Sequence, residues 1–291
     1  MILPASEGDG GGAVPSWRAI RSFARAAEAH DLDSVWMFDH FFYAPPSGPI
    51  EGQHEAWTIV SAVAAVTERV EIGTLVLCSS FRSPTMHAKM AATADEVSDG
   101  RLILGLGAGW HDPEYMAFGF PTDHRVGRFE EALGIIAPLV RGETMTFDGT
   151  YHRAREAVLV PAPARRIPVL VAAARPRMMR LTARYADAWN TAWYGAPDER
   201  LRRQLDAFDE AMASERRDPT TMDRTVGIEV RDPERDPGGE DGGDRSFGGS
   251  VDELAEAVTA YEALGIDHLI VLLQPLDETS IERLVLALSR R

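Results

Sequence analysis

Hydrophobic residues follow two alternating periods along this chain. Short, nearly continuous apolar runs are typical of buried parallel strands, and between them apolar residues recur every three to four positions, as on one helix face. The first predicted strand ends at Leu3, and the others span 34–38, 70–78, 102–107, 168–173, 188–190, 226–230 and 268–273. Strand–helix units repeated in one run most simply close into a (β/α)8 barrel, the TIM barrel of the α/β class.

The predicted barrel has irregular parts. Its first strand is truncated, because only three residues precede Pro4. Residues 231–249, after the seventh predicted strand, are acidic and rich in glycine, so we expect a mobile loop there. A small hairpin is predicted at 145–152. The whole chain, residues 1–291, is nevertheless predicted to form one barrel domain, since its length suits this fold.

Composition narrows the classes of partner. The formal net charge of −15 argues against nucleic acid and an anionic membrane, since both repel an acidic surface. No apolar run approaches the roughly 20 residues that span a bilayer, and the first residues lack the pattern of a signal peptide. We therefore expect a cytoplasmic protein. A single cysteine, Cys78, excludes a disulfide framework, and the histidines lack metal-binding spacings, so no metal site is expected.

Reactive groups in such a barrel lie where strands end and helices have not yet begun. Asp39 and His40 come directly after the second predicted strand. A histidine in this place can exchange a proton near neutral pH, so His40 is a candidate catalytic residue. The alternative is a histidine whose hydrogen bonds are satisfied beside a capping aspartate.

Three glycines alternate in the fourth predicted strand and the turn after it. Gly105, Gly107 and Gly109 therefore face one side, where the missing side chains leave room for a flat ring. The alternative is that small residues merely fit the packing of the barrel. A dinucleotide-binding fingerprint is excluded, because its third glycine would fall at Trp110.

Two further groups at strand ends suggest ligand contacts. Ala173, Ala174 and Arg175 lie between a strand and a helix N-terminus, which suits a phosphate, although an ordinary turn has the same composition. Arg82 is a second candidate contact for an anion, or a surface charge. Aromatic side chains at strand ends can form a wall against a planar ligand. Trp110 and Trp193 occupy such positions, whereas Trp36 and Trp189 fit the core.

Several motifs together resemble the bacterial luciferase-like superfamily, in particular its branch that uses the deazaflavin coenzyme F420. The resemblance rests on the run RLILGLGAGWHDPEY at 101–115, on FGFP at 118–121, on RFEEAL at 128–133 and on ADAWN at 186–190. It implies a barrel with the cofactor ring against the second, third and fourth strands, and a non-prolyl cis peptide near Leu75-Val76. The implied cofactor contacts are Asp39, His40, Thr74, Leu75, Val76, Cys78, Gly107, Ala108, Gly109, Ala173, Ala174 and Arg175.

Three departures from the family pattern bear on the ligands. Deazaflavin-dependent sugar-phosphate dehydrogenases carry a glutamate directly after the glycine turn, where this chain has Trp110, so that substrate class is disfavoured. Ala174 and Arg175 replace the glycine pair that binds phosphate after the fifth strand. Cys78 stands where threonine is frequent, and a weaker contact with the cofactor is expected there.

The resemblance implies an F420-dependent oxidoreductase that transfers a hydride to or from a small organic substrate. His40 would be the acid–base group, with Trp110, His111 and Trp193 lining the substrate side. One alternative is a monooxygenase that uses reduced FMN supplied by a separate flavin reductase, and another is a flavin-binding protein without turnover. A partner flavin or F420 reductase and a homodimer both stay open.

Overall fold

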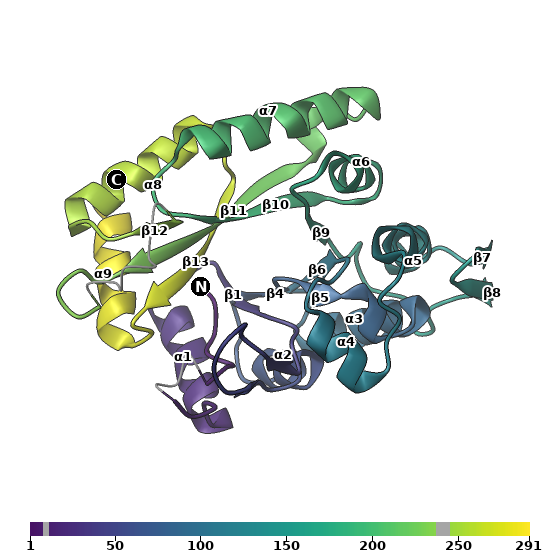
Figure 1. The fold of residues 1–291 in the computed structure, drawn as a ribbon, viewed down its shortest axis with the longest axis horizontal. Helices are drawn as coiled ribbons and strands as arrows, with labels where there is room; N and C mark the ends of the chain where they lie inside the picture. The colour runs from purple at the N-terminus through teal and green to yellow at the C-terminus, as the bar shows by residue number, and fades with distance from the viewer. Residues whose placement is uncertain (8–11, 237–244) are drawn as a thin grey trace.

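The computed structural model describes residues 1–7, 12–236 and 245–291, and in it parallel strands curl into a barrel surrounded by helices (Figure 1). Each strand of the barrel pairs in parallel with its neighbours, as the apolar runs predict. The main strands are β1 (Ser34–Met37), β4 (Glu71–Thr74), β6 (Leu102–Gly107), β9 (Val169–Ala172), β10 (Ala188–Tyr194), β11 (Asp223–Arg231) and β13 (His268–Gln274).

A very short first strand closes the barrel between β13 and β1. The Ile2 backbone N–H donates to the carbonyl oxygen of Val271 at 2.8 Å, while the Trp36 N–H donates to the Met1 oxygen at 2.9 Å. Ile2 also forms a parallel bridge with Trp36. The prediction of a truncated first strand in a (β/α)8 barrel is thus confirmed.

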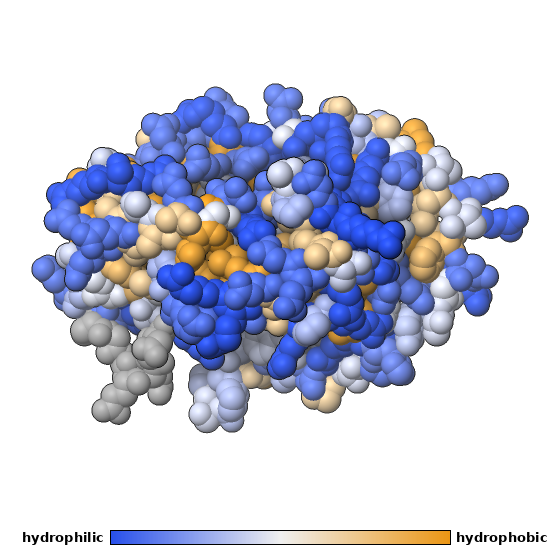
Figure 2. All heavy atoms as spheres, turned by 90° about the horizontal axis from the view of Figure 1, so that it is seen from above, coloured by the Kyte–Doolittle hydropathy of each residue, from blue (hydrophilic) through white to orange (hydrophobic). Residues whose placement is uncertain are grey.

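The outer helices bury their apolar faces against this sheet. Several begin at a polar side chain that caps backbone N–H groups, such as Ser83 before Pro84 and the capping box of Ser250 and Glu253. The helices are α1 (Trp17–Ala29), α2 (Ala56–Ala64), α3 (Pro84–Val97), α5 (Arg125–Val140), α6 (Pro176–Tyr185), α7 (Glu199–Ser214), α8 (Val251–Ala263) and α9 (Glu278–Leu288). Seen from above, across α7, the surface is mostly hydrophilic with smaller hydrophobic areas, as its many charged residues imply (Figure 2).

Short elements between the strands differ most from the sequence-based expectation. The helix α4 (Asp112–Phe118) and the antiparallel pair β2 (Phe42–Tyr43) and β3 (Glu51–Gly52) were not predicted. Each is too short to show a hydrophobic period. The expected hairpin at 145–152 is longer, formed by β7 (Met145–Asp148) and β8 (Arg153–Ala157). The remaining short elements are η1 (Ser79–Phe81), η2 (Pro219–Thr221) and β12 (Ser246–Phe247), which pairs with β11.

The third predicted strand is interrupted rather than continuous. A cis peptide bond joins Leu75 to Val76, as the family resemblance implied, and separates β4 from β5 (Leu77–Cys78). A second non-prolyl cis bond, between Ala192 and Trp193 in β10, was not predicted. Both bonds lie at the carboxyl ends of barrel strands.

The strand glycines allow close packing between neighbouring strands. The sequence left two interpretations of them open, room for a flat ring or small residues that fit the packing of the barrel, and the structure favours the second. A Cβ on Gly105 would lie 1.8 Å from the Thr74 carbonyl oxygen, and one on Gly107 would lie 2.6 Å from the Val76 side chain. The space that these glycines leave is therefore filled by the neighbouring strand. The expectation that both make room directly for a cofactor ring was wrong.

Both tryptophans expected in the core are there. Trp36 and Trp189 are 1% and 0% exposed, and the Trp189 ring stacks on Phe208 with centroids 4.3 Å apart. In the acidic segment 231–249, Arg231 forms ion pairs with Glu229 and Asp236. Residues 237–244 lie outside the described residues, so the mobile loop predicted at 231–249 stays a prediction. The division into one barrel domain over residues 1–291 also stays a prediction.

A buried histidine on α3 should make stability depend on pH. Burial, assisted by the Arg82 charge, lowers the pKa of His87 to about 3. The unfolded chain takes up this proton near pH 6.5, so the free energy of unfolding falls as pH drops from there toward 3. We expect wild type to lose about 2 kcal/mol more between pH 7 and pH 5 than His87→Leu does. Urea unfolding at both pH values measures this.

The exposed His124 provides the control for this experiment. Its side chain is 66% exposed, so His124→Leu should keep the pH dependence of wild type. An equal loss of stability in wild type and His87→Leu would contradict the assignment.

Candidate active site

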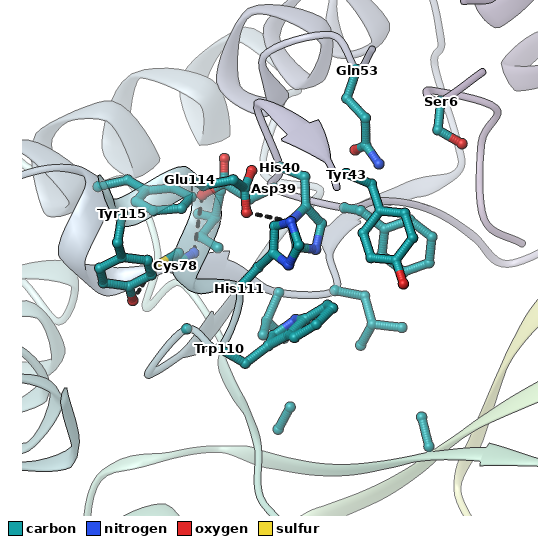
Figure 3. A pocket seen from close by; sticks show the side chains of 18 of the residues that line it. Ser6, Asp39, His40, Tyr43, Gln53, Cys78, Trp110, His111, Glu114 and Tyr115 are labelled. Atoms are coloured by element: carbon teal, nitrogen blue, oxygen red, sulfur yellow. Dashed lines mark hydrogen bonds and ion pairs between the residues drawn. The ribbon is translucent and has the colours of Figure 1, made fainter. Parts of the chain in front are cut away.

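A cleft of about 450 Å³ opens at the carboxyl ends of the barrel strands (Figure 3). It brings together residues from the ends of β1, β5 and β6, from α4 and from the β2–β3 hairpin. Its lining residues are Ser6, Phe38, Asp39, His40, Tyr43, Glu51, Gln53, Leu75, Val76, Leu77, Cys78, Phe81, Gly109, Trp110, His111, Glu114, Tyr115, Ala172, Asn190, Ala192 and Trp193. Most are apolar or aromatic, as in a site for a planar organic ligand.

His40 is held by a buried carboxylate. Its Nδ1 lies 2.8 Å from Glu114 Oε2, and the Glu114 side chain is 1% exposed. The other oxygen of Glu114 accepts the backbone N–H groups of Phe41, at 2.5 Å, and Phe42. This arrangement fixes the imidazole ring with a proton on Nδ1, which leaves Nε2 for exchange with a ligand.

His111 lies beside this pair, with ring centroids 6.1 Å from His40. The Ala44 backbone N–H donates to His111 Nε2 at 3.0 Å, so the ring proton is on Nδ1. Burial lowers the pKa of His111, which favours the neutral ring. His111 can therefore donate a hydrogen bond without carrying charge, while the Trp110 ring stands 5.6 Å from His40.

Asp39 belongs to an internal ion pair with Arg82. The Arg82 guanidinium donates to both Asp39 oxygens, at 2.8 and 3.1 Å, and also to Glu55. The Cys78 backbone N–H donates to Asp39 Oδ2 at 3.0 Å. Burial raises the pKa of Asp39, and the Arg82 charge opposes this shift. Arg82 is only 13% exposed, so its interpretation as a surface charge was wrong, and the carboxylates that it contacts are those of Asp39 and Glu55.

Cys78 and Tyr115 form the floor next to Gly109. The Tyr115 hydroxyl donates to the Ala108 carbonyl oxygen at 3.0 Å and lies 3.0 Å from Cys78 Sγ, which therefore donates to it. Burial raises the pKa of the Cys78 thiol to about 11, so it is neutral at physiological pH. Gly109 has φ +77°, and a Cβ there would lie 1.9 Å from the Tyr115 hydroxyl.

The structure brings many of the predicted site residues together in the cleft and leaves others outside its lining. Thr74 is fully buried, and its hydroxyl donates to the Gly105 carbonyl oxygen at 2.9 Å. Ala173 is also buried, and its backbone N–H donates to the backbone carbonyl oxygen of Asn190 at 3.0 Å. The predicted residues in the lining are Asp39, His40, Leu75, Val76, Cys78, Gly109, Trp110, His111 and Trp193, and those outside it are Thr74, Gly107, Ala108, Ala173, Ala174 and Arg175.

Sequence reasoning missed several residues that define the cleft. Glu114 and Tyr115 stand within the family-like run 101–115, but only their contacts with His40 and Cys78 assign them a role. Tyr43, Glu51 and Gln53 come from the unpredicted β2–β3 hairpin and its end. The sequence signal for Glu114 was a carboxylate shortly after a strand end, and the hairpin residues gave none.

Within residues 1–7, 12–236 and 245–291, no group of three or more His, Cys, Asp or Glu side chains is placed to hold a metal ion. In the same part of the chain no helix has the length and apolar character needed to cross a membrane.

Fold and cleft together define the class, a (β/α)8 barrel with its candidate site at the carboxyl ends of the strands. The family model described as luciferase-like monooxygenase matches residues 1–231, and the chain belongs to this family. Curated relatives include proteins named F420-dependent glucose-6-phosphate dehydrogenase from Gordonia bronchialis and Kineococcus radiotolerans, each 32% identical. The matches cover 73% and 72% of this chain but 64% and 63% of the relatives, so the chain spans less than two thirds of their length.

Solved structures share the fold. An F420-dependent secondary alcohol dehydrogenase in complex with an F420-acetone adduct superposes with a TM-score of 0.80 at 21% identity, over 95% of this chain and 96% of that one. The coenzyme F420-dependent tetrahydromethanopterin reductase from Methanopyrus kandleri gives 0.75 at 16% identity, over 98% and 95%. A monooxygenase from Streptomyces bottropensis gives 0.75 at 22% identity, over 94% and 93%. These similarities confirm the predicted fold.

Proposed function

We propose that this protein is an F420-dependent oxidoreductase that transfers a hydride to or from a small organic substrate. The observation that carries the proposal is the His40–Glu114 pair, whose Nδ1–Oε2 distance is 2.8 Å, beside an apolar wall in the cleft. Such a pair supplies the proton exchange that hydride transfer at a carbon bearing oxygen requires. Relatives named for F420 dependence support the cofactor.

The cleft fits a planar tricyclic cofactor. The interrupted strand places Leu75 and Val76 along one wall, and Ala172 and Ala192 leave space opposite. The cofactor's phosphate would lie at the N-terminus of α6, where Arg175 is exposed and makes no ion pair with a described residue. There, the Ala173 N–H is already used, so Ala174, Arg175 and the first free N–H groups of α6 would bind the phosphate.

The catalytic residues would share the proton chemistry. When bound, F420 accepts a hydride from the substrate carbon or returns one to it. His40 Nε2 takes the hydroxyl proton during oxidation and donates it during reduction, while Glu114 stabilises the ring in both states. The neutral His111 donates a hydrogen bond to the substrate oxygen. Trp110 and Trp193 exclude water from this region.

We place the protein in the cytoplasm, with a small-molecule substrate as its main partner. A homodimer, and a separate reductase that recycles the cofactor, are both compatible with this proposed function.

Cofactor choice is the first test of the function. Titration of the purified protein with F420 should quench tryptophan fluorescence at micromolar concentration, because Trp110 and Trp193 line the cleft. We expect FMN to bind at least tenfold more weakly. The variant Trp110→Phe should bind F420 with a smaller change in fluorescence, which ties the signal to the cleft.

Two results would contradict the proposal in different ways. Micromolar binding of FMN alone would favour the reduced-FMN monooxygenase, to which the family description also points. Tight binding of F420 with no hydride transfer across a broad panel of alcohols and carbonyl compounds would favour the protein without turnover.

A further inference from the structure

We infer that the substrate is an alcohol or its carbonyl counterpart that carries no phosphate or carboxylate and places a hydrogen-bond donor, such as a hydroxyl group, against Glu51 and Gln53. The inference rests on the proposed function, because it concerns the same cleft. It is carried by the charges that line the cleft and by two acceptors at the end formed by the β2–β3 hairpin.

The cleft offers an anion no permanent positive charge, since none of the described residues that line it is lysine or arginine. The nearby Arg82 is already bound by Asp39 and Glu55. Arg200 stacks over the Tyr194 ring at 4.0 Å and donates to the Trp193 carbonyl oxygen. A phosphate or carboxylate in the cleft would thus be desolvated without a charged partner, which is strongly unfavourable.

The lining also carries carboxylates. The Asp39 carboxylate is neutralised by its ion pair with Arg82, and the Glu114 carboxylate accepts a hydrogen bond from His40. Glu51 is half-buried and forms no ion pair with a described residue. An anionic substrate would therefore meet an unbalanced negative charge, and the field of Glu51 selects against it.

One buried acceptor at the same end of the cleft receives no hydrogen bond from a described residue. Gln53 Oε1 is buried and has no hydrogen-bond partner among the described residues. Figure 3 shows the Gln53 side chain pointing toward Tyr43, which pairs with Glu51 across the hairpin. Buried acceptors are normally satisfied, so a ligand that donates hydrogen bonds here is favoured over one that does not.

Aromatic side chains line the same cleft. Phe38 and Trp193 pack edge to face with centroids 6.0 Å apart, and Tyr43 and Trp110 lie 6.3 Å apart. Such faces contact the C–H groups of an uncharged carbon chain. The relatives are named for glucose 6-phosphate, whose phosphate has no cation to bind in this cleft.

In the proposed reaction the substrate alcohol loses two electrons. Its C–H bond breaks and the hydride passes to F420, while its O–H bond breaks and the proton passes to His40 Nε2, so the carbonyl compound is formed. The reverse reaction consumes the reduced cofactor and the same proton.

The inference is tested with secondary alcohols that share the reacting carbon and differ only at the far end, which carries methyl, hydroxyl, ammonium, carboxylate or phosphate. The initial rate of F420 reduction gives kcat/KM for each. We expect the hydroxyl and ammonium compounds, which donate hydrogen bonds, to be best, the methyl compound about tenfold lower, and the carboxylate and phosphate compounds at least a hundredfold lower. A carboxylate or phosphate compound within threefold of the hydroxyl compound would overturn the inference.

Charge reversal at one residue sharpens the test. Glu51→Arg should raise kcat/KM for the carboxylate compound at least tenfold and lower it for the hydroxyl compound. The matched control is Asp148→Arg, which makes the same charge change at an 81% exposed side chain on the β7–β8 hairpin and should alter neither value. An unchanged substrate preference in Glu51→Arg contradicts the role of Glu51.

Cofactor binding separates this inference from the proposed function. Fluorescence titration with F420 should give the same affinity within twofold in wild type and both variants. If wild type does not bind F420, the proposed function fails. If it binds F420 but prefers anionic substrates, or reduces F420 with none of the uncharged alcohols, the substrate inference fails.

Discussion

His40→Ala should lower kcat for F420-linked turnover by about 10²–10⁴-fold, the usual contribution of a positioned acid–base group. Affinity for F420 should change much less, because the ring wall formed by Leu75 and Val76 stays in place. Steady-state rates and fluorescence titration measure the two effects separately. The control is His124→Ala, since His124 is exposed. A rate within threefold of wild type would remove His40 from the mechanism.

Glu114 acts through His40 and is therefore a positioning residue. Glu114→Gln keeps the size of the side chain and removes its charge, so the His40 imidazolium loses its partner at 2.8 Å. We expect kcat to fall about tenfold with KM little changed, because the carboxylate no longer stabilises the charge that His40 gains when it takes the proton. In the His40→Ala background the same change should have little further effect. An equal loss of rate in both backgrounds would indicate a structural role only.

Arg82→Met should lower the free energy of unfolding by about 3–5 kcal/mol, because it leaves the buried Asp39 carboxylate without its partner. Asp39 is 3% exposed and receives two hydrogen bonds from Arg82. Urea unfolding at pH 7 measures the loss. The surface pair of Arg290 and Asp252 gives a matched control, since Arg290→Met should cost less than about 1 kcal/mol.

A second substitution separates charge from packing. Adding Asp39→Asn to Arg82→Met removes the uncompensated charge, so the double variant should recover at least half of the lost stability. If the double variant is as unstable as Arg82→Met alone, the loss comes from packing around Arg82, and the ion pair has little part in it.

The barrel was predictable because its signal is long and repeated. Continuous apolar runs such as 102–107 can be strands only if both faces are buried, and the amphipathic stretches between them fix the alternation. Even the single bridge at Ile2 followed from the short apolar segment before Pro4. The β2–β3 hairpin and α4 were not predictable, since two to seven residues do not establish a period.

The site was predictable only in part for a related reason. Topology places the ends of parallel strands at one rim, which located His40, Trp110 and His111 correctly in the cleft. The partner of His40 lies 74 residues away in α4, and no local pattern links the two. Arg82 was misread because its sequence neighbours do not reveal that Asp39 and Glu55 approach it.

The strand glycines have a consequence for the evolution and redesign of this protein. A side chain at Gly105 would collide with the Thr74 backbone and one at Gly107 with the Val76 side chain, so this wall tolerates little change. New substrate ranges are therefore expected elsewhere, in the β2–β3 hairpin outside Gly52 and in α4 outside the buried Glu114 and Tyr115. A mutational library confined to those two segments should diversify specificity while the cofactor wall is inherited unchanged.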